Sequence, residues 1–238
     1  MSKKQLTESF VDSIGNDALN IATDFFEVGL DAIMEEGLLK DIPIVSTAIA
    51  LFKMGNSIVD RHNIKKLAAF INSFNESVID EEKVRKYKEK IRSNTAKAEQ
   101  EIEFLLIILA QYIGYEKPKM LSKIYLAYLD EKIKWKDLVL LSEVVDRLLP
   151  GDYDELASAQ LFTTKDGVGD HIMLRLEALG LIIEEKQSGA FVKTGRGGLA
   201  ITSESIANFN MKKNERKYIH TDLGKVLIDI LGWRMDRV

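Results

Sequence analysis

The sequence predicts a mainly α protein, with an N-terminal helical domain over about residues 1–150 and a smaller α+β domain over residues 151–238. Apolar residues recur at helical spacing through the first 150 residues. Ten of the 15 glycines lie at or after Gly151, which indicates a change to turns and short strands. The chain has 238 residues, of which 46% are hydrophobic, enough to build one large core or two small ones.

Composition restricts the chemistry and the location of the protein. The chain has no cysteine, so it has no disulfide, no thiolate zinc site and no cysteine nucleophile. The first residues do not read as a signal peptide. The longest apolar run, residues 42–52, is half of the about 20 residues that a membrane-spanning helix needs. We therefore expect a cytoplasmic protein.

Helical spacing predicts one or two helices between residues 10 and 30. Asp41 and Pro43 are typical of a helix start, so a helix is expected over the dense apolar segment 44–52. The pattern then continues in a further helix over residues 58–74.

A strongly charged helix is predicted next, over Glu81 to Arg92, because Val84, Tyr87 and Ile91 recur at helical spacing. Its basic residues predict a basic outer face on this helix, which is either an ordinary solvated face or a contact for an anionic surface. They are Lys83, Arg85, Lys86, Lys88, Lys90 and Arg92.

Three more helices complete the predicted N-terminal domain. The first, residues 96–115, is apolar all round at Phe104 to Leu109, so we expect it to be enclosed in the core. The others cover residues 119–129 and 135–149, and Pro150-Gly151 is expected to stop the last one.

The C-terminal domain is predicted to contain both helices and strands. A helix-ending glycine, Gly180, follows the second helix, and Thr221-Asp222 caps the last one. The expected order is helix, helix, strand, long glycine-bearing connection, strand and helix. The helices are expected over 156–162, 169–179 and 223–231, and the strands over 181–185 and 217–220.

Two phrases of this domain resemble bacterial winged-helix proteins. The phrase RLEALGLI, residues 175–182, resembles the end of their recognition helix, and YIHTDLGK, residues 218–225, resembles the close of their wing. His220 stands where that pattern usually has an apolar residue. The resemblance covers about residues 152–232 and implies a winged-helix-like module, a fold that serves in DNA binding and in protein interaction.

The N-terminal domain carries a second resemblance. The phrases DIPIVSTA, residues 41–48, and KPKML, residues 117–121, are similar to those of an uncharacterised family of bacterial helical proteins. This similarity implies a bacterial or mobile-element context and no site residues. It suggests one alternative function, a membrane-acting effector in bacterial self-defence such as phage defence, with residues 42–52 inserting into a membrane only on activation. The other interpretation of that segment is a buried core helix.

Nothing in the sequence indicates an enzyme. The histidines are His62, His171 and His220, and none belongs to an H-E-x-x-H zinc motif. No G-x-S-x-G nucleophile motif is present. The glycines at residues 195–198 lack the spacing of a phosphate-binding loop, so a wing tip is the better interpretation. We expect no catalytic, metal or cofactor-binding residue.

The connection between the two predicted strands is basic. Residues 186–217 hold seven basic side chains and two acidic ones, in a chain whose net charge is −4. Such a wing suits contacts with phosphates or with an acidic partner. The candidate contacts are Lys193, Arg196, Lys212, Lys213, Arg216 and Lys217.

The predicted recognition helix is a poor reader of DNA bases. It offers Asp166, Asp170, His171, Arg175 and Glu177, whereas base recognition in the major groove favours arginine, lysine, asparagine and glutamine. The leading hypothesis is therefore a non-enzymatic binding or regulatory protein that contacts a protein partner, or a second copy of itself, through the winged-helix-like module. A DNA-binding regulator that uses the basic wing is the first alternative.

Overall fold

The computed structural model describes residues 3–15, 42–52, 57–78, 80–158, 161–164, 170–185 and 216–232. The prediction of a mainly α protein is confirmed for these residues, which contain many helices and one small sheet. The chain divides into two compact units, unit 1 over Met1–Asp146 and unit 2 over Arg147–Val238. Each unit is described by itself.

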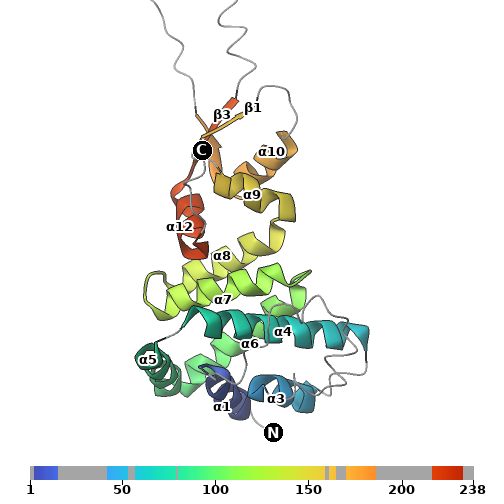
Figure 1. The fold of residues 1–238 in the computed structure, drawn as a ribbon, viewed down its shortest axis with the longest axis vertical. Helices are drawn as coiled ribbons and strands as arrows, with labels where there is room; N and C mark the ends of the chain where they lie inside the picture. The colour runs from blue at the N-terminus through green and yellow to red at the C-terminus, as the bar shows by residue number, and fades with distance from the viewer. Residues whose placement is uncertain are drawn as a thin grey trace, which may run out of the picture. The chain divides into compact units, whose positions relative to one another are not determined.

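Unit 1 is a bundle of helices in which α4 lies along α7, and α1 lies against α3 and α6 (Figure 1). The described helices are α1 (Lys3–Ser13), α3 (Pro43–Phe52), α4 (Ile58–Ser77), α5 (Glu81–Ser93), α6 (Thr95–Gln111), α7 (Glu116–Leu129) and α8 (Trp135–Arg147).

Aromatic rings form the centre of unit 1. Tyr125 of α7 is fully buried, and its ring lies 6.0 Å from Phe10 of α1 and 6.3 and 6.2 Å from Phe70 and Phe74 of α4, between ring centroids. These distances are typical of favourable aromatic pairs. The core therefore joins three helices that are far apart in sequence.

Helix α3 begins at Pro43, where a missing backbone N–H costs nothing. Its apolar residues Ile44, Val45 and Ala48 are buried, in a helix that packs on α1, which is the arrangement of a core helix. Within the described ranges, no helix combines the length and the apolar character needed to cross a membrane.

Helix α6 is less enclosed than its sequence predicts. Leu105, Ile108 and Leu109 are buried, but Ile107 is 53% exposed. The expectation that all of Phe104 to Leu109 lies inside the core is therefore wrong. A bundle this small covers only one side of α6, so one stripe of the helix remains at the surface.

The helix predicted over residues 135–149 is confirmed as α8, but the structure between residues 150 and 162 differs from the prediction. Helix α8 ends at Arg147, and Pro150 begins the next helix, α9 (Pro150–Ser158), because proline suits a first helical position as well as it stops a preceding helix. The helix expected over residues 156–162 is replaced by the end of α9 and by strand β1 (Leu161–Thr164).

Unit 2 surrounds a three-stranded antiparallel sheet in the order β1-β3-β2. Residue Ile219 of the central strand is paired with Leu161 on one side and Ile183 on the other. Buried side chains from the helices and the sheet form a separate core, among them Leu156, Leu176 and Tyr218. The remaining elements are α10 (Asp170–Ala178), β2 (Ile182–Glu184), β3 (Arg216–His220) and α12 (Asp222–Leu231).

Candidate partner-binding surfaces

The two phrases singled out in unit 2 meet at the end of α10. Gly180 has a φ of +71°, and the N–H groups of Gly180 and Leu181 donate to the carbonyls of Glu177 and Leu176, which is the usual glycine-terminated helix end. The predicted stop at Gly180 is therefore confirmed. The hydroxyl of Thr221 lies 2.6 Å from the Gly180 carbonyl, so it ties the start of α12 to this turn.

Gly224 lets α12 approach this turn closely. A Cβ atom at this position would lie 2.1 Å from the carbonyl oxygen of Leu181, a distance that no real Cβ contact shows. The N–H of Gly224 also donates to the Thr221 hydroxyl, at 3.1 Å, which caps α12. The phrase Thr-Asp-Leu-Gly therefore joins α12 to the end of α10.

The arginine of α10 is held inside unit 2. Arg175 Nε donates to Oδ2 of Asp152 at 2.8 Å, and its Nη2 donates to Oδ1. The carboxylate is fully buried and also accepts from the backbone N–H of Leu149 at 2.7 Å, at the start of α9. The ion pair with Asp152 raises the pKa of Arg175. Two of its guanidinium nitrogens are therefore committed to Asp152, and the ion pair joins α9 to α10.

The outward stripe of α10 is uncharged or apolar. His171, Leu174 and Ala178 lie at steps of three and four residues and are exposed, with Leu174 at 53%. Met173 and Leu176 face the core. Apart from Arg175, no lysine or arginine lies on the part of α10 that the structure describes.

The sheet of unit 2 also exposes apolar side chains. Ile183 of β2 and Ile219 of β3 are direct cross-strand partners, and they are 52% and 39% exposed. Tyr218 and His220, which alternate with Ile219 along β3, are buried. One face of the sheet therefore packs on the core and the other presents an isoleucine pair.

The free edge of β2 is partly closed. The N–H of Glu184 donates to a carboxylate oxygen of Glu177 at 3.3 Å. Because a further strand would need this N–H, the contact disfavours the addition of a partner strand at this edge.

Most of the predicted basic wing lies outside the described residues. Lys193, Arg196, Lys212 and Lys213 are in the segment 186–215, of which the structure describes nothing. Arg216 and Lys217 begin β3 opposite Thr164 and Thr163, and the Lys217 side chain is half-buried.

The unusual His220 has a structural role. Its side chain is buried, and Nε2 lies 2.9 Å from the carbonyl oxygen of Leu156, in the last turn of α9. Since a carbonyl only accepts, Nε2 carries the hydrogen. Burial is the main cause of the lowered pKa of His220, and nearby Lys225 lowers it further, against the effect of this hydrogen bond. The neutral ring therefore satisfies a helix-terminal carbonyl.

The other two histidines, His62 and His171, lie in α4 and α10. His62 Nδ1 lies 3.2 Å from the hydroxyl of Tyr115, and His171 is exposed on α10. His62 is half-buried. Among the residues that the structure describes, no three His, Asp or Glu side chains lie close enough to hold a metal ion.

The basic residues of α5 do not form a single outer face. At about 100° per residue, the buried Tyr87 and Ile91 define the inner side, and the outermost positions hold Glu82 and Glu89. The cations lie along the two flanks between these sides. One flank carries Lys83, Lys86 and Lys90, and the other carries Arg85, Lys88 and Arg92. Lys83, Arg85, Lys86 and Arg92 are exposed, so the outer side of α5 carries these cations together with Glu82 and Glu89.

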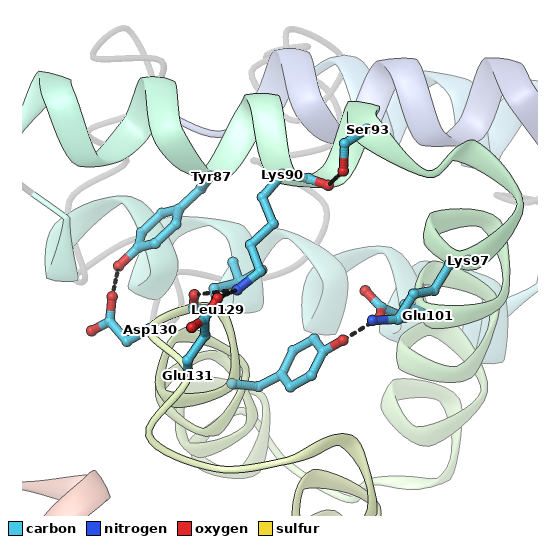
Figure 2. Close-up of polar contacts among 9 residues, drawn as sticks. Tyr87, Lys90, Ser93, Lys97, Glu101, Leu129, Asp130 and Glu131 are labelled. Carbon is cyan, nitrogen blue, oxygen red and sulfur yellow. Dashed lines mark hydrogen bonds and ion pairs between the residues drawn. The ribbon is translucent and has the colours of Figure 1, made fainter.

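Each flank of α5 reaches an acidic residue of another element, as Figure 2 shows for Lys90. Lys90 Nζ lies 2.9 Å from both the Leu129 carbonyl at the end of α7 and the Glu131 carboxylate. Arg92 lies 3.4 Å from Asp12 of α1. Lys90, and more weakly Lys86, lower the pKa of Glu131. Two of the six cations therefore hold α5 on unit 1.

Buried lysines at helix ends were not predicted. Lys66 of α4 is 1% exposed and donates at 2.9 Å to the carbonyls of Ala110 and Tyr112, where α6 ends. Lys117 of α7 donates to the Asp146 carbonyl near the end of α8. With Lys90, three ammonium groups meet the negative ends of three helix dipoles. The sequence gives no sign of this, because each carbonyl comes from a different helix.

Comparison of the chain with models of known protein families, with curated proteins and with solved structures gave no match.

Proposed function

We propose that this chain is a non-enzymatic binding protein, and that unit 2 is a winged-helix-like module that contacts a protein. The element order α9-β1-α10-β2-β3-α12 and the sheet order β1-β3-β2 support this assignment, since strand β1 supplies the third strand that a winged helix needs. The contacts of Thr221 and Gly224 with the end of α10 give a structural role to both segments that resemble winged-helix proteins, residues 175–182 and 218–225.

The ion pair between Arg175 and Asp152 is the observation that carries the choice of a protein over DNA. A recognition helix reads bases with side chains that extend into the major groove. The arginine of α10 is committed to a buried carboxylate instead. Releasing it would leave the buried carboxylate with only the N–H of Leu149 as a partner, which is unfavourable.

The exposed groups of unit 2 favour a protein surface as the partner. Leu174 on α10 and the Ile183–Ile219 pair on the sheet are apolar and exposed. Apolar side chains of this kind contribute to the centre of protein interfaces, whereas interfaces with DNA are polar and strongly basic. The partner is a second protein or a second copy of this chain.

A titration with DNA tests the choice. We expect the full chain to bind a fluorescent duplex weakly, without sequence preference, and less well as salt rises, because phosphate contacts of the basic wing are screened by salt and carry no sequence information. The double variant Lys212→Glu, Lys213→Glu should remove this residual binding. Sub-micromolar binding to one defined duplex, lost in the double variant, would instead make the chain a DNA-binding regulator.

Photo-crosslinking tests the protein partner. A photoreactive residue at position 174 should crosslink to one protein, or to a second copy, in cells that express the full chain. The matched control is position 154 on α9, where Asp154 is also exposed. Equal crosslinking from both positions would mean that the stripe of α10 is not a specific surface.

A further inference from the structure

Helix α5 is attached to unit 1 through little buried surface. Only Tyr87 and Ile91 are buried among its 13 residues. Tyr87 packs edge-on against the ring of Phe74, with 6.3 Å between centroids. Val84 covers the backbone of Gly15, where even a Cβ atom would lie 2.3 Å from its Cγ1. The apolar seat of α5 therefore consists of these three side chains.

Polar links supply the remaining attachment, and those of Tyr87 and Lys90 converge on the end of α7 (Figure 2). The hydroxyl of Tyr87 donates to Asp130. Burial first, and then this hydrogen bond, raise the pKa of Tyr87, so the hydroxyl stays protonated. Lys90 contacts Leu129 and Glu131 as described above. The pair between Arg92 and Asp12 is 59% exposed on both sides, so salt screens it strongly.

The connection between α5 and α6 suits a hinge. Asn94 alone separates the two helices, as the C-cap of α5 and the N-cap of α6. Its side chain accepts from the N–H of Lys97 at 3.1 Å, so the start of α6 keeps its cap when α5 moves away. The other end of α5 is joined to α4 by the three residues between Ser77 and Glu81, so α5 moves only if the backbone rotates at both connections.

We propose that α5 is a latch of unit 1, which opens at its two short connections, to α4 and at Asn94, while α4, α6 and α7 stay packed. Opening breaks the links to Asp130, Leu129, Glu131 and Asp12, and it uncovers the apolar seat at Phe74 and Gly15. Because two of these links are ion pairs, ionic strength controls how often the latch opens. A helix of 13 residues is marginal alone in water, so the released α5 also loses its helical hydrogen bonds.

Amide hydrogen exchange of the full chain tests the latch. The amides of α5 should exchange through a local opening, with protection factors at least about tenfold below those of α4 and α7. Raising the ionic strength from about 0.05 M to about 1 M should lower α5 protection a further threefold to tenfold, roughly, because two exposed ion pairs are screened. Protection in α4 should change less.

A pair of variants identifies the link that matters. Lys90→Met should raise exchange in α5 about fivefold and leave α4 and α7 unchanged, since it removes one charged contact at the end of α7. Lys83→Met is the matched control, because Lys83 lies on the same flank, is exposed, and makes no hydrogen bond or ion pair with the described residues. Its α5 exchange should equal that of the unmodified chain.

Three results would overturn the proposal. One is equal protection of the α5 and α4 amides in the unmodified chain. This measurement does not depend on the folding of any variant. Another is the same loss of protection in all helices with Lys90→Met, which would make Lys90 part of the global fold. The third is an equal effect of Lys83→Met and Lys90→Met on exchange in α5. That result would mean that the net charge of α5, and not the contacts of Lys90, controls the opening.

Discussion

Lys66 shows how a single buried charge is tolerated in unit 1. Its ammonium is enclosed, and two carbonyls at the end of α6 replace water around it. Burial still disfavours the charged form, and it lowers the pKa of Lys66 from 10.5 to about 8. The neighbouring His62 is affected as well, since burial and then Lys66 and Lys65 lower its pKa.

The lowered pKa of Lys66 predicts that stability rises with pH in the alkaline range. Below about pH 8 the folded and unfolded chains both carry the proton, so folding bears the full cost of the buried charge. Between about pH 8 and pH 10.5 the folded chain loses the proton and the unfolded chain keeps it. The free energy of unfolding therefore rises through this interval.

Chemical denaturation of the unmodified chain and of Lys66→Met checks this. Between about pH 7 and pH 10, the unmodified chain should gain about 2 kcal/mol relative to the variant. His62 titrates below this interval and does not disturb the comparison. Parallel pH profiles of the two proteins would mean that water reaches the Lys66 ammonium.

At the scale of elements, α6 shows that an apolar sequence does not by itself predict which side chains are buried. Ile107 and Ile108 are adjacent and chemically identical, but they are 53% and 5% exposed. Ile108→Ala should lower the free energy of unfolding by about 2–5 kcal/mol, because it leaves a cavity in the core. Ile107→Ala should change it by less than about 0.5 kcal/mol. Equal losses at both positions, in urea denaturation, would contradict this orientation of α6.

The sequence predicts helices well where their determinants are local. The spacing of Val84, Tyr87 and Ile91 identifies α5, and Thr221 identifies the start of α12 through its cap. Strand β1 was missed because four residues, Leu161–Thr164, are too short for a periodic pattern, and their partner strand follows more than 50 residues later. Pro150 was misjudged because proline is common at both boundaries of a helix.

The candidate sites depend on partners that no local pattern contains. The spacing of α5 identifies its cations, but the acids that bind two of them, Glu131 and Asp12, lie in distant parts of the chain. Arg175 is likewise paired with Asp152, which lies 23 residues earlier. Contacts between distant segments therefore decide which charges remain for a partner.

At the scale of the whole molecule, each unit has its own core. Unit 1 is built on the rings of Phe10, Phe70, Phe74 and Tyr125, and unit 2 on buried residues of its helices and sheet. A unit with its own core can open without the other. Hydrogen exchange should therefore separate the stability of the two units.

Gly224→Ala tests this separation. The new methyl group would lie against the Leu181 carbonyl, so α12 must move away from the end of α10, at a cost of about 1–3 kcal/mol. Protection should fall in α12, β2 and β3 and stay the same in α4 and α7. Gly151→Ala is the matched control in the same unit, because a Cβ there meets no atom within 4 Å and alanine favours a helix. If Gly224→Ala lowers protection equally in α4 and α12, the chain unfolds as one cooperative unit, and the two cores depend on each other.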